Sequence, residues 1–255
     1  MILALDIGNS NIVIGVIDKN KIYCVERIFT DLNKTASEYD LKLKNILDLY
    51  NISIEQIDGT IISSVVPMLN DVLKSAVKKL TNKNIILVDD KIKTNINFDS
   101  KFNQKEIGSD LICATVGAIN AYTPPLAIID MGTATTITIV DKNNCFLGGM
   151  ILPGVKISMK ALVSSTAQLP EINLSQPQSF IATNTIDCMK SGLIYSNACI
   201  VDGMIERIEK ELNQNVTSIA TGGLCEYILP YCKSNIIFDN NLILKGLYYI
   251  YECNS

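Results

Sequence analysis

At 255 residues, the chain is long enough for one large domain or for two lobes that each bury a core. Hydrophobic residues make up 48% of it and charged residues 19%, which is typical of a globular protein and excludes a disordered one. The net charge of -4, without a run of five or more basic residues, argues against a nucleic-acid partner.

The first half opens with a predicted strand, a Gly/Asn turn and a returning strand. Strands and helices then alternate, which predicts a largely parallel sheet with helices on both faces. The predicted strands are residues 2–6, 11–17, 21–29, 60–66 and 84–88, and the predicted helices are residues 35–49 and 68–80.

The opening pattern returns at mid-chain, where a second D-x-G turn again joins two apolar runs and a third strand follows. Asp130 matches Asp6, Gly132 matches Gly8 and Thr133 matches Asn9. This repeat indicates an internal duplication with a period of about half the chain. Prolines 124 and 125 mark the expected boundary, which gives an N-terminal lobe of residues 1–123 and a C-terminal lobe of residues 124–255.

Residues 185–212 form a long predicted helix with an unusually wide apolar face. One stripe runs through Met189, Leu193, Ile200, Met204 and Ile208, and Ile194, Val201, Ile205 and Leu212 broaden it. Such a face fits a helix that packs on its own lobe and on a partner subunit, or one that is simply buried in a large lobe.

The absence of histidine limits the acid–base chemistry of the chain more than any other property of its composition. A Ser-His-Asp triad, a Cys-His pair and a His-ligated zinc are all excluded. Acid–base work must fall to Asp, Glu, Lys, Tyr or Cys, and carboxylates are the leading candidates. The eight cysteines form no C-x-x-C pair, and their apolar neighbours favour buried thiols in a reducing compartment.

The N-terminal segment MILALDIGNS has no charged n-region and reaches an aspartate at position 6, so we expect no signal peptide. Apolar runs of membrane-spanning length do not occur in the sequence. We therefore expect a cytoplasmic protein without a membrane partner.

The two D-x-G turns supply groups that suit the phosphates of a nucleotide. Glycine lets backbone N–H groups approach a phosphate closely, and neighbouring Asn, Ser and Thr side chains add donors. The Asp at each strand end offers hard oxygen to a cation, and Mg²⁺ bound with phosphates needs only one or two carboxylates. One such motif is commonly an ordinary turn, whereas the duplicated pair is a much stronger signal.

The common nucleotide-binding loops are missing. G-x-G-x-x-G does not occur, and residues 149–156 resemble a Walker loop only superficially, because Val155 stands where the lysine belongs. A third glycine turn, Thr221-Gly222-Gly223, follows the apolar run at 216–220. It fits either an adenosine site or a plain turn.

The motifs DIGNSN at 6–11, DMGTATT at 130–136 and TGG at 221–223 resemble those of the actin, Hsp70 and sugar-kinase superfamily. Finer motifs are similar to those of type III pantothenate kinases: ISSVVP at 62–67, GSD at 108–110, GGMILPG at 148–154, NT at 184–185 and SG at 191–192. The resemblance covers nearly the whole chain. It implies an α/β fold of two duplicated actin-like (ribonuclease H-like) lobes, each a mixed sheet flanked by helices, with a cleft between the lobes.

The resemblance also implies an activity, because this family transfers the γ-phosphoryl group of ATP to pantothenate in the first step of coenzyme A biosynthesis. The implied cofactors are ATP, Mg²⁺ and a monovalent cation, K⁺ or NH₄⁺, and the implied assembly is a homodimer. Asp110 would accept the hydroxyl proton of pantothenate, Asp6 would bind Mg²⁺ and Asp130 the monovalent cation. The residues implied to bind ATP are Asp6, Ile7, Gly8, Asn9, Ser10, Asn11, Ile12, Val13, Gly132, Thr133, Gly222 and Gly223. Those implied to bind pantothenate are Gly108, Ser109, Asp110, Leu111 and, from the neighbouring subunit, Thr185.

Two features near Asp110 depart from the family pattern. Leu111 occupies the place of an arginine and cannot make a bidentate contact to a carboxylate. Residues 101–104 replace an aromatic–x–Asn–Pro stretch, and Lys101 or Phe102 is a candidate contact to pantothenate. Asp110 also has a purely structural interpretation, as the N-cap of a helix that begins at Leu111.

Two other functions stay open. Leu111 is compatible with a non-catalytic regulator of the same fold that binds a nucleotide. An actin-like ATPase is disfavoured, because 255 residues leave no room for the extra subdomains of filament-forming proteins.

Overall fold

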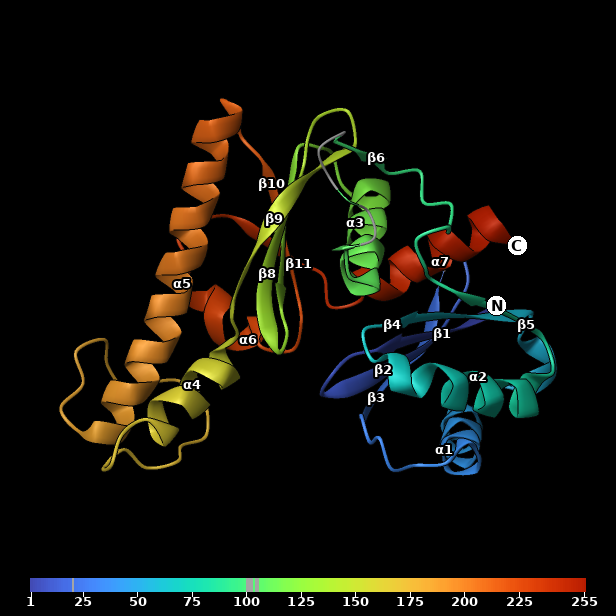
Figure 1. Cartoon of the computed structure of the whole chain (residues 1–255). Coiled ribbons are helices and arrows are strands. Elements are labelled where there is room, and N and C mark those ends of the chain that lie inside the picture. The colour runs from blue at the N-terminus through green and yellow to red at the C-terminus, as the bar shows by residue number, and fades with distance from the viewer. Residues whose placement is uncertain (20, 100–102, 104–105) are drawn as a thin grey trace. The chain divides into compact units, whose positions relative to one another are not determined.

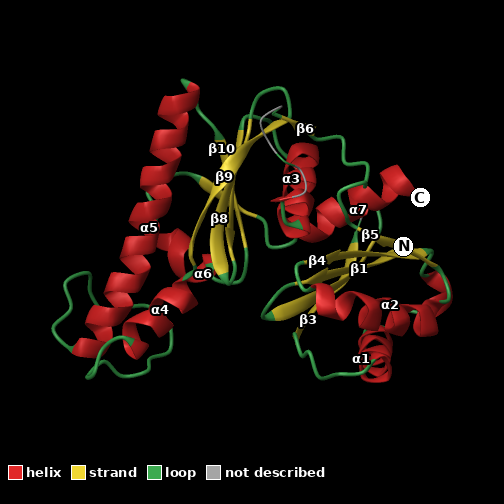
Figure 2. Cartoon of the chain, viewed as in Figure 1, coloured by secondary structure: helices red, strands yellow, loops and turns green. Residues whose placement is uncertain are grey.

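The computed structural model describes residues 1–19, 21–99, 103 and 106–255 (Figures 1 and 2). The described residues form two compact units. Unit 1 contains Met1–Ile96, Asn103–Ala121 and Asn241–Ser255, and unit 2 contains Asn97–Phe102 and Tyr122–Asn240.

Unit 1 is built on a five-stranded mixed sheet with the order β3-β2-β1-β4-β5. Its strands are β1 (Ile2–Ile7), β2 (Asn11–Ile17), β3 (Ile22–Phe29), β4 (Gly59–Ser64) and β5 (Asn84–Leu87). The first three strands pair antiparallel, whereas β1, β4 and β5 pair parallel. The prediction of a largely parallel sheet was therefore wrong for this half, because short turns join β1 to β2 and β2 to β3, and a short turn can join only antiparallel strands.

Helices cover both faces of this sheet (Figure 1). They are α1 (Ala36–Leu49), α2 (Pro67–Thr81), α3 (Ser109–Ala121) and α7 (Leu242–Asn254), with a short turn of 3₁₀ helix at Ile54–Gln56. The start of α1 is fixed by a capping box, in which Thr35 and Glu38 satisfy each other's backbone N–H groups. Residues of α1 and α2 pack on alternate residues of β1 and β2, and Tyr39, Leu43 and Leu47 are fully buried there.

The other face of the sheet carries α3 and α7, which cross at two glycines. A Cβ on Gly117 would overlap the carbonyl of Leu242, and a Cβ on Gly246 would overlap the carbonyl of Cys113. The helices approach this closely only because both positions lack a side chain. As a result the C-terminal helix lies in unit 1, although the predicted C-terminal lobe, residues 124–255, included it.

Unit 2 repeats the topology of unit 1. Its six-stranded sheet has the order β11-β10-β7-β8-β9-β6, so β7, β8, β9, β10 and β11 correspond to β1, β2, β3, β4 and β5. The strands are β6 (Asn97–Phe98), β7 (Leu126–Met131), β8 (Ala134–Val140), β9 (Cys145–Pro153), β10 (Thr217–Thr221) and β11 (Ile236–Phe238). The repeated strand order is what the repeated D-x-G motif predicted.

The helices of unit 2 are α4 (Val155–Ser164), α5 (Thr185–Leu212) and the short α6 (Cys225–Ile228), which is followed by a 3₁₀ turn at Leu229–Tyr231. Helix α5 has the predicted bounds, and Asn184 caps it by accepting the N–H of Asp187. Its residues Leu193, Ile194, Val201 and Ile205 pack into the core of the unit. No helix within the described ranges is long and apolar enough to cross a membrane.

Candidate active site

The first D-x-G turn joins β1 to β2 and presents polar residues to solvent. The N–H of Gly8 donates to the carbonyl of Asn11 at 3.0 Å and closes the turn. Asn9, Ser10 and Asn11 are exposed, as a phosphate-binding loop requires. Ile7 and Ile12, which were predicted to bind ATP, are fully buried in the core, and the carbonyl of Ile7 accepts the N–H of Val65.

A chain of hydroxyl groups connects Asp6 to the start of helix α3. The parallel register of β1 and β4 places Ser63 opposite Asp6, and the Ser63 hydroxyl donates to Asp6 Oδ1 at 2.9 Å. Ser63 is fully buried, and its Oγ lies 3.1 Å from Ser109 Oγ. Asp6, at the end of a strand, is thereby tied to the helix that carries Asp110.

Ser109 links β4 to α3 through its side chain. Its hydroxyl accepts the N–H of Ser64 at 2.9 Å, and its one proton can go either to Ser63 Oγ or to the carbonyl of Ser64, which lies 3.0 Å away. Ser109 was predicted to contact pantothenate, but these bonds give its hydroxyl a structural partner on each side. The sequence motif contained Ser63 and Ser64 without indicating this role for them.

Asp110 lies in the first turn of α3. The helix begins at Ser109 and not at Leu111, so Asp110 is not the N-cap and that prediction was wrong. Its Oδ1 still accepts the N–H of Leu111 at 2.8 Å, which stabilises the carboxylate at the positive end of the helix. A Cβ on Gly108 would overlap Asp110 Oδ1, so glycine there leaves the carboxylate in place.

Burial raises the pKa of the Asp6 and Asp110 carboxylates. It raises the pKa of Asp6 from 3.8 to about 7; the hydrogen bond from Ser63 opposes this shift and the negative charge of Asp110 adds to it. Burial also raises the pKa of Asp110, against the stabilising N–H groups of Leu111 and of Asp110 itself. Two basic carboxylates near one another suit proton acceptance and Mg²⁺ binding at neutral pH.

The two carboxylates also fit the modest needs of a nucleotide-bound Mg²⁺ ion. Among the residues that the structure describes, no group of three or more Asp, Glu, Cys or His side chains could hold a metal ion by itself. A Mg²⁺ ion that arrives with phosphates needs only one or two protein carboxylates, so Asp6 is a sufficient donor.

The second D-x-G turn, in unit 2, repeats the closing hydrogen bond of the first. The N–H of Gly132 donates to the carbonyl of Ala134 at 3.0 Å, and Thr133 is exposed at the tip. The register of β7 and β10 places Thr221 opposite Asp130, as Ser63 lies opposite Asp6. Gly222, at a φ of 101°, comes so close that a Cβ on it would lie 2.7 Å from Asp130 Oδ1. The T-G-G turn and the second D-x-G turn therefore form one local site.

The remaining predicted pantothenate contacts are Thr185, Leu111 and either Lys101 or Phe102. Thr185 is exposed at the first position of α5, in unit 2. Leu111 is partly exposed beside Asp110. Lys101 and Phe102 lie outside the described residues.

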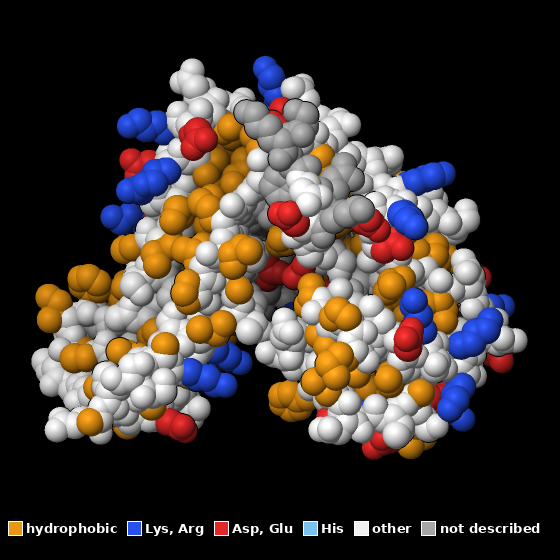
Figure 3. All heavy atoms as spheres, in the orientation of Figure 1, with side chains coloured by type: hydrophobic (Ala, Val, Ile, Leu, Met, Phe, Trp, Pro, Cys, Tyr) orange, Lys and Arg blue, Asp and Glu red, His pale blue; other side chains and the backbone are white. Residues whose placement is uncertain are grey.

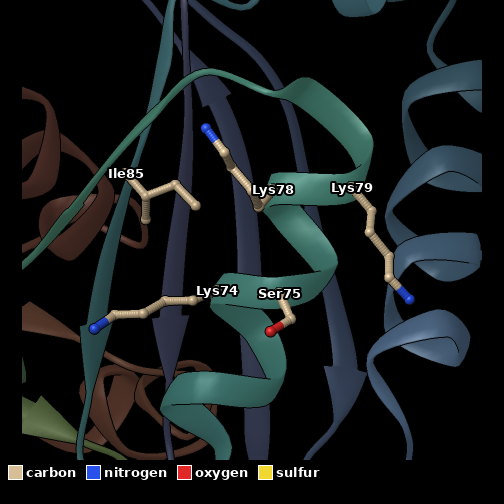
Figure 4. Close-up of a pocket in the computed structure, with 5 residues that line it drawn as sticks. All are labelled: Lys74, Ser75, Lys78, Lys79 and Ile85. Atoms are coloured by element: carbon tan, nitrogen blue, oxygen red, sulfur yellow. The ribbon is translucent and has the colours of Figure 1, made fainter.

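A surface hollow of about 530 Å³ lies elsewhere on unit 1 and contains none of the predicted site residues (Figure 4). Lys74, Ser75, Lys78 and Lys79 of α2 and Ile85 of β5 surround it. Lys79 points away from the others in Figure 4 and donates to Ser37 Oγ at 3.0 Å.

The repeated strand order and the two D-x-G turns give the protein an actin-like fold. A candidate N-acetylmannosamine kinase from Listeria monocytogenes has the same fold, with a TM-score of 0.52 and 12% identity over 100% of this chain and 99% of that one. Component A of (R)-2-hydroxyglutaryl-CoA dehydratase from Acidaminococcus fermentans is similar with a TM-score of 0.58 and 12% identity, over 100% and 99% of the two chains. The predicted fold class is thus confirmed.

Sequence comparisons narrow this class to one family. The family model of type III pantothenate kinases matches residues 2–207. A type III pantothenate kinase from Brevibacillus brevis is 39% identical over 100% of both chains. The chain belongs to the type III pantothenate kinase family, as its motifs predicted.

Proposed function

We propose that the protein transfers the γ-phosphoryl group of ATP to pantothenate and forms 4'-phosphopantothenate, the first intermediate on the route to coenzyme A. The observation that carries this proposal is the hydrogen-bonded connection from Asp6 through Ser63 and Ser109 to the helix of Asp110, in a member of this family.

Asp110 is the proposed catalytic residue. Phosphoryl transfer has a loose transition state, so a carboxylate mainly orients the attacking hydroxyl and accepts its proton late. The raised pKa of Asp110 favours this acceptance at neutral pH. Asp6 is proposed to hold Mg²⁺, which neutralises charge on the phosphates when it is bound, while the exposed residues of the first turn donate to phosphate oxygens.

In unit 2 we assign the second D-x-G turn and the T-G-G turn to ATP as well. Asp130 is the proposed ligand of a monovalent cation, K⁺ or NH₄⁺. Its carboxylate lies beside the backbone of Gly222, and the carbonyl of Met131 lies next to the same glycine. Carboxylate and carbonyl oxygens are the hard donors that such cations prefer.

We also propose that the protein is a homodimer and that the exposed hydrophobic surface of unit 2 along α5 is its interface. Figure 3 shows hydrophobic side chains gathered over this part of the unit, and Phe180 and Ile181 are 65% and 81% exposed. A hollow of about 460 Å³ beside them is lined by Phe180, Ala182, Cys188, Ser191, Gly192, Tyr195, Ser196 and Cys199. Thr185 begins the same helix, so a second copy seated here would bring its Thr185 to this interface.

The dimer is tested by the mass of the protein in solution. Ile181→Asp places a charge on the proposed interface and is expected to give a monomer in light scattering. Leu49→Asp is the matched control, because Leu49 is 69% exposed on unit 1. A dimer that survives Ile181→Asp as well as Leu49→Asp would contradict this interface.

The activity is tested with purified protein, ATP, Mg²⁺ and K⁺, scored for phosphopantothenate. Formation of the product, and ADP release that depends on pantothenate, are expected. The regulator hypothesis predicts nucleotide binding without product, and that result would refute the kinase proposal. Because the reaction consumes ATP, we also propose that the protein works in the cytoplasm.

A further inference from the structure

We propose that Thr30 is the positioning residue of the first D-x-G turn. Thr30 follows β3 directly and makes two hydrogen bonds to the turn. Its N–H donates to the carbonyl of Ser10 at 3.1 Å, and its hydroxyl donates to the carbonyl of Gly8 at 2.6 Å. One residue therefore holds two carbonyls of the turn.

Fixing these carbonyls also fixes the direction of two N–H donors. In a planar trans peptide, the C=O of one residue and the N–H of the next point in opposite directions. With the carbonyls of Gly8 and Ser10 directed at Thr30, the N–H groups of Asn9 and Asn11 point away from it. Asn9 and Asn11 are both exposed, so we expect these donors to be accessible to a phosphate.

The position of Thr30 is fixed by a residue of the hydrophobic core, Tyr39, through the neighbouring Asp31. The Tyr39 hydroxyl donates to the carbonyl of Asp31 at 2.9 Å and accepts the N–H of Asp31 at 3.1 Å. Tyr39 is fully buried on α1, so its hydroxyl is a fixed point. The connection from Tyr39 through Asp31 to Thr30 makes the turn rigid before any ligand binds, which reduces the entropy cost of binding.

The duplication gives independent support for this role. Phe29 pairs with Asn11 and Pro153 pairs with Ala134, so the next residues, Thr30 and Gly154, occupy equivalent places behind the two turns. A Cβ on Gly154 would overlap the carbonyl of Thr133, so in unit 2 the backbone itself approaches the turn. The first turn has one more residue than the second. In the first turn the side chain of Thr30, and not the backbone alone, makes the contact to the turn.

The inference rests on the proposed function, in which the first turn binds ATP phosphates, and it is tested by nucleotide binding without pantothenate. Thr30→Val keeps the shape and removes the hydroxyl donor, whereas Thr30→Ser keeps the donor. We expect Thr30→Val to weaken Mg²⁺–ATP binding in calorimetry by about tenfold, and Thr30→Ser to stay within about threefold of the wild type. The KM for ATP should rise in parallel, and the KM for pantothenate should not change.

Thr217→Val is the matched control, because the Thr217 hydroxyl donates to the carbonyl of Thr123 at 2.9 Å at the start of β10. It should bind ATP as the wild type does. Amide hydrogen exchange of residues 8–11 should become faster in Thr30→Val while that of α1 is unchanged. Tyr39→Phe, which keeps the Thr30 hydroxyl, should give a smaller loss of affinity in the same direction.

Unchanged ATP affinity in Thr30→Val, or an equal loss in Thr30→Val and Thr30→Ser, would overturn the inference. Slower or unchanged amide hydrogen exchange at residues 8–11 of Thr30→Val would also overturn the inference, even if that variant is less stable than the wild type. Failure of the proposed function gives a different result. A wild-type protein that binds ATP without forming phosphopantothenate would contradict the kinase reaction and leave the role of Thr30 in ATP binding intact.

Discussion

The ionisation of Asp6 makes the stability of the ligand-free protein depend on pH. Burial raises the pKa of Asp6 from 3.8 to about 7, so between these values the folded protein keeps a proton that the unfolded chain releases. The unfolding free energy is therefore expected to fall as the pH rises through this range and to level off above it. Asp6→Asn removes the ionisation while it keeps an oxygen that accepts from Ser63. The variant should be more stable than the wild type above pH 7 and similar to it near pH 4.

The size of the effect follows from the pKa shift. A shift from 3.8 to about 7 is roughly three units at about 1.4 kcal/mol each, which gives an upper limit of about 4 kcal/mol. Asp6 keeps partial exposure at the end of β1, so water offsets part of the burial cost. We expect Asp6→Asn to raise the unfolding free energy near pH 8 by about 2 kcal/mol.

Urea unfolding with EDTA and without nucleotide, at about pH 5 and about pH 8, measures this difference. Asp31→Asn is a control of opposite sign, because the N–H of Asn33 lowers the pKa of Asp31, so its loss should destabilise the protein near pH 8. An Asp6→Asn variant that is no more stable than the wild type near pH 8 would refute the assignment of a buried, destabilised carboxylate. So would a gain that is equal at both pH values, since it would not arise from ionisation.

Three further predictions concern the site and the fold. Asp110→Asn should lower turnover by about 10²–10⁴-fold and leave ATP affinity unchanged, and a fully active variant would exclude Asp110 as the proton acceptor. Replacing K⁺ with Na⁺ should depress turnover if Asp130 binds a monovalent cation, and equal rates in the two salts would count against that site. Gly246→Ala should cost about 1–3 kcal/mol in urea unfolding, because its methyl group meets the carbonyl of Cys113. Gly203→Ala is the control, since its methyl group meets only the guanidinium of Arg207.

Local sequence patterns predicted the local structure well. The apolar runs around both D-x-G turns, the predicted helix at residues 35–49 and the periodicity of residues 185–212 each depend on one local segment, and the structure has them at or near the predicted bounds. The direction of strand pairing was predicted less well, because the alternation of strands and helices was extended to the whole sheet, although the predicted returning strand of each half pairs antiparallel with the first.

The contacts that position the site were not predictable, because they join residues far apart in the chain. The Ser63 hydroxyl reaches Asp6 across 57 positions and Ser109 across 46. Thr30 bonds to Gly8 across 22 positions, and a threonine after a strand carries no local signal of such a role. The place of α7 in unit 1 depends likewise on two distant glycines that let helices cross closely.

The same duplication explains why a repeated motif does not assign a role to each half. Asp6 and Asp130 stand at equivalent strand ends opposite Ser63 and Thr221, yet their surroundings differ. Asp6 accepts a hydroxyl hydrogen bond and feels the charge of Asp110, whereas Asp130 lies beside the backbone of Gly222. A carboxylate near a second carboxylate gains most from a divalent cation, because that charge offsets both. The difference in neighbours therefore distinguishes the two halves, although their turns are copies.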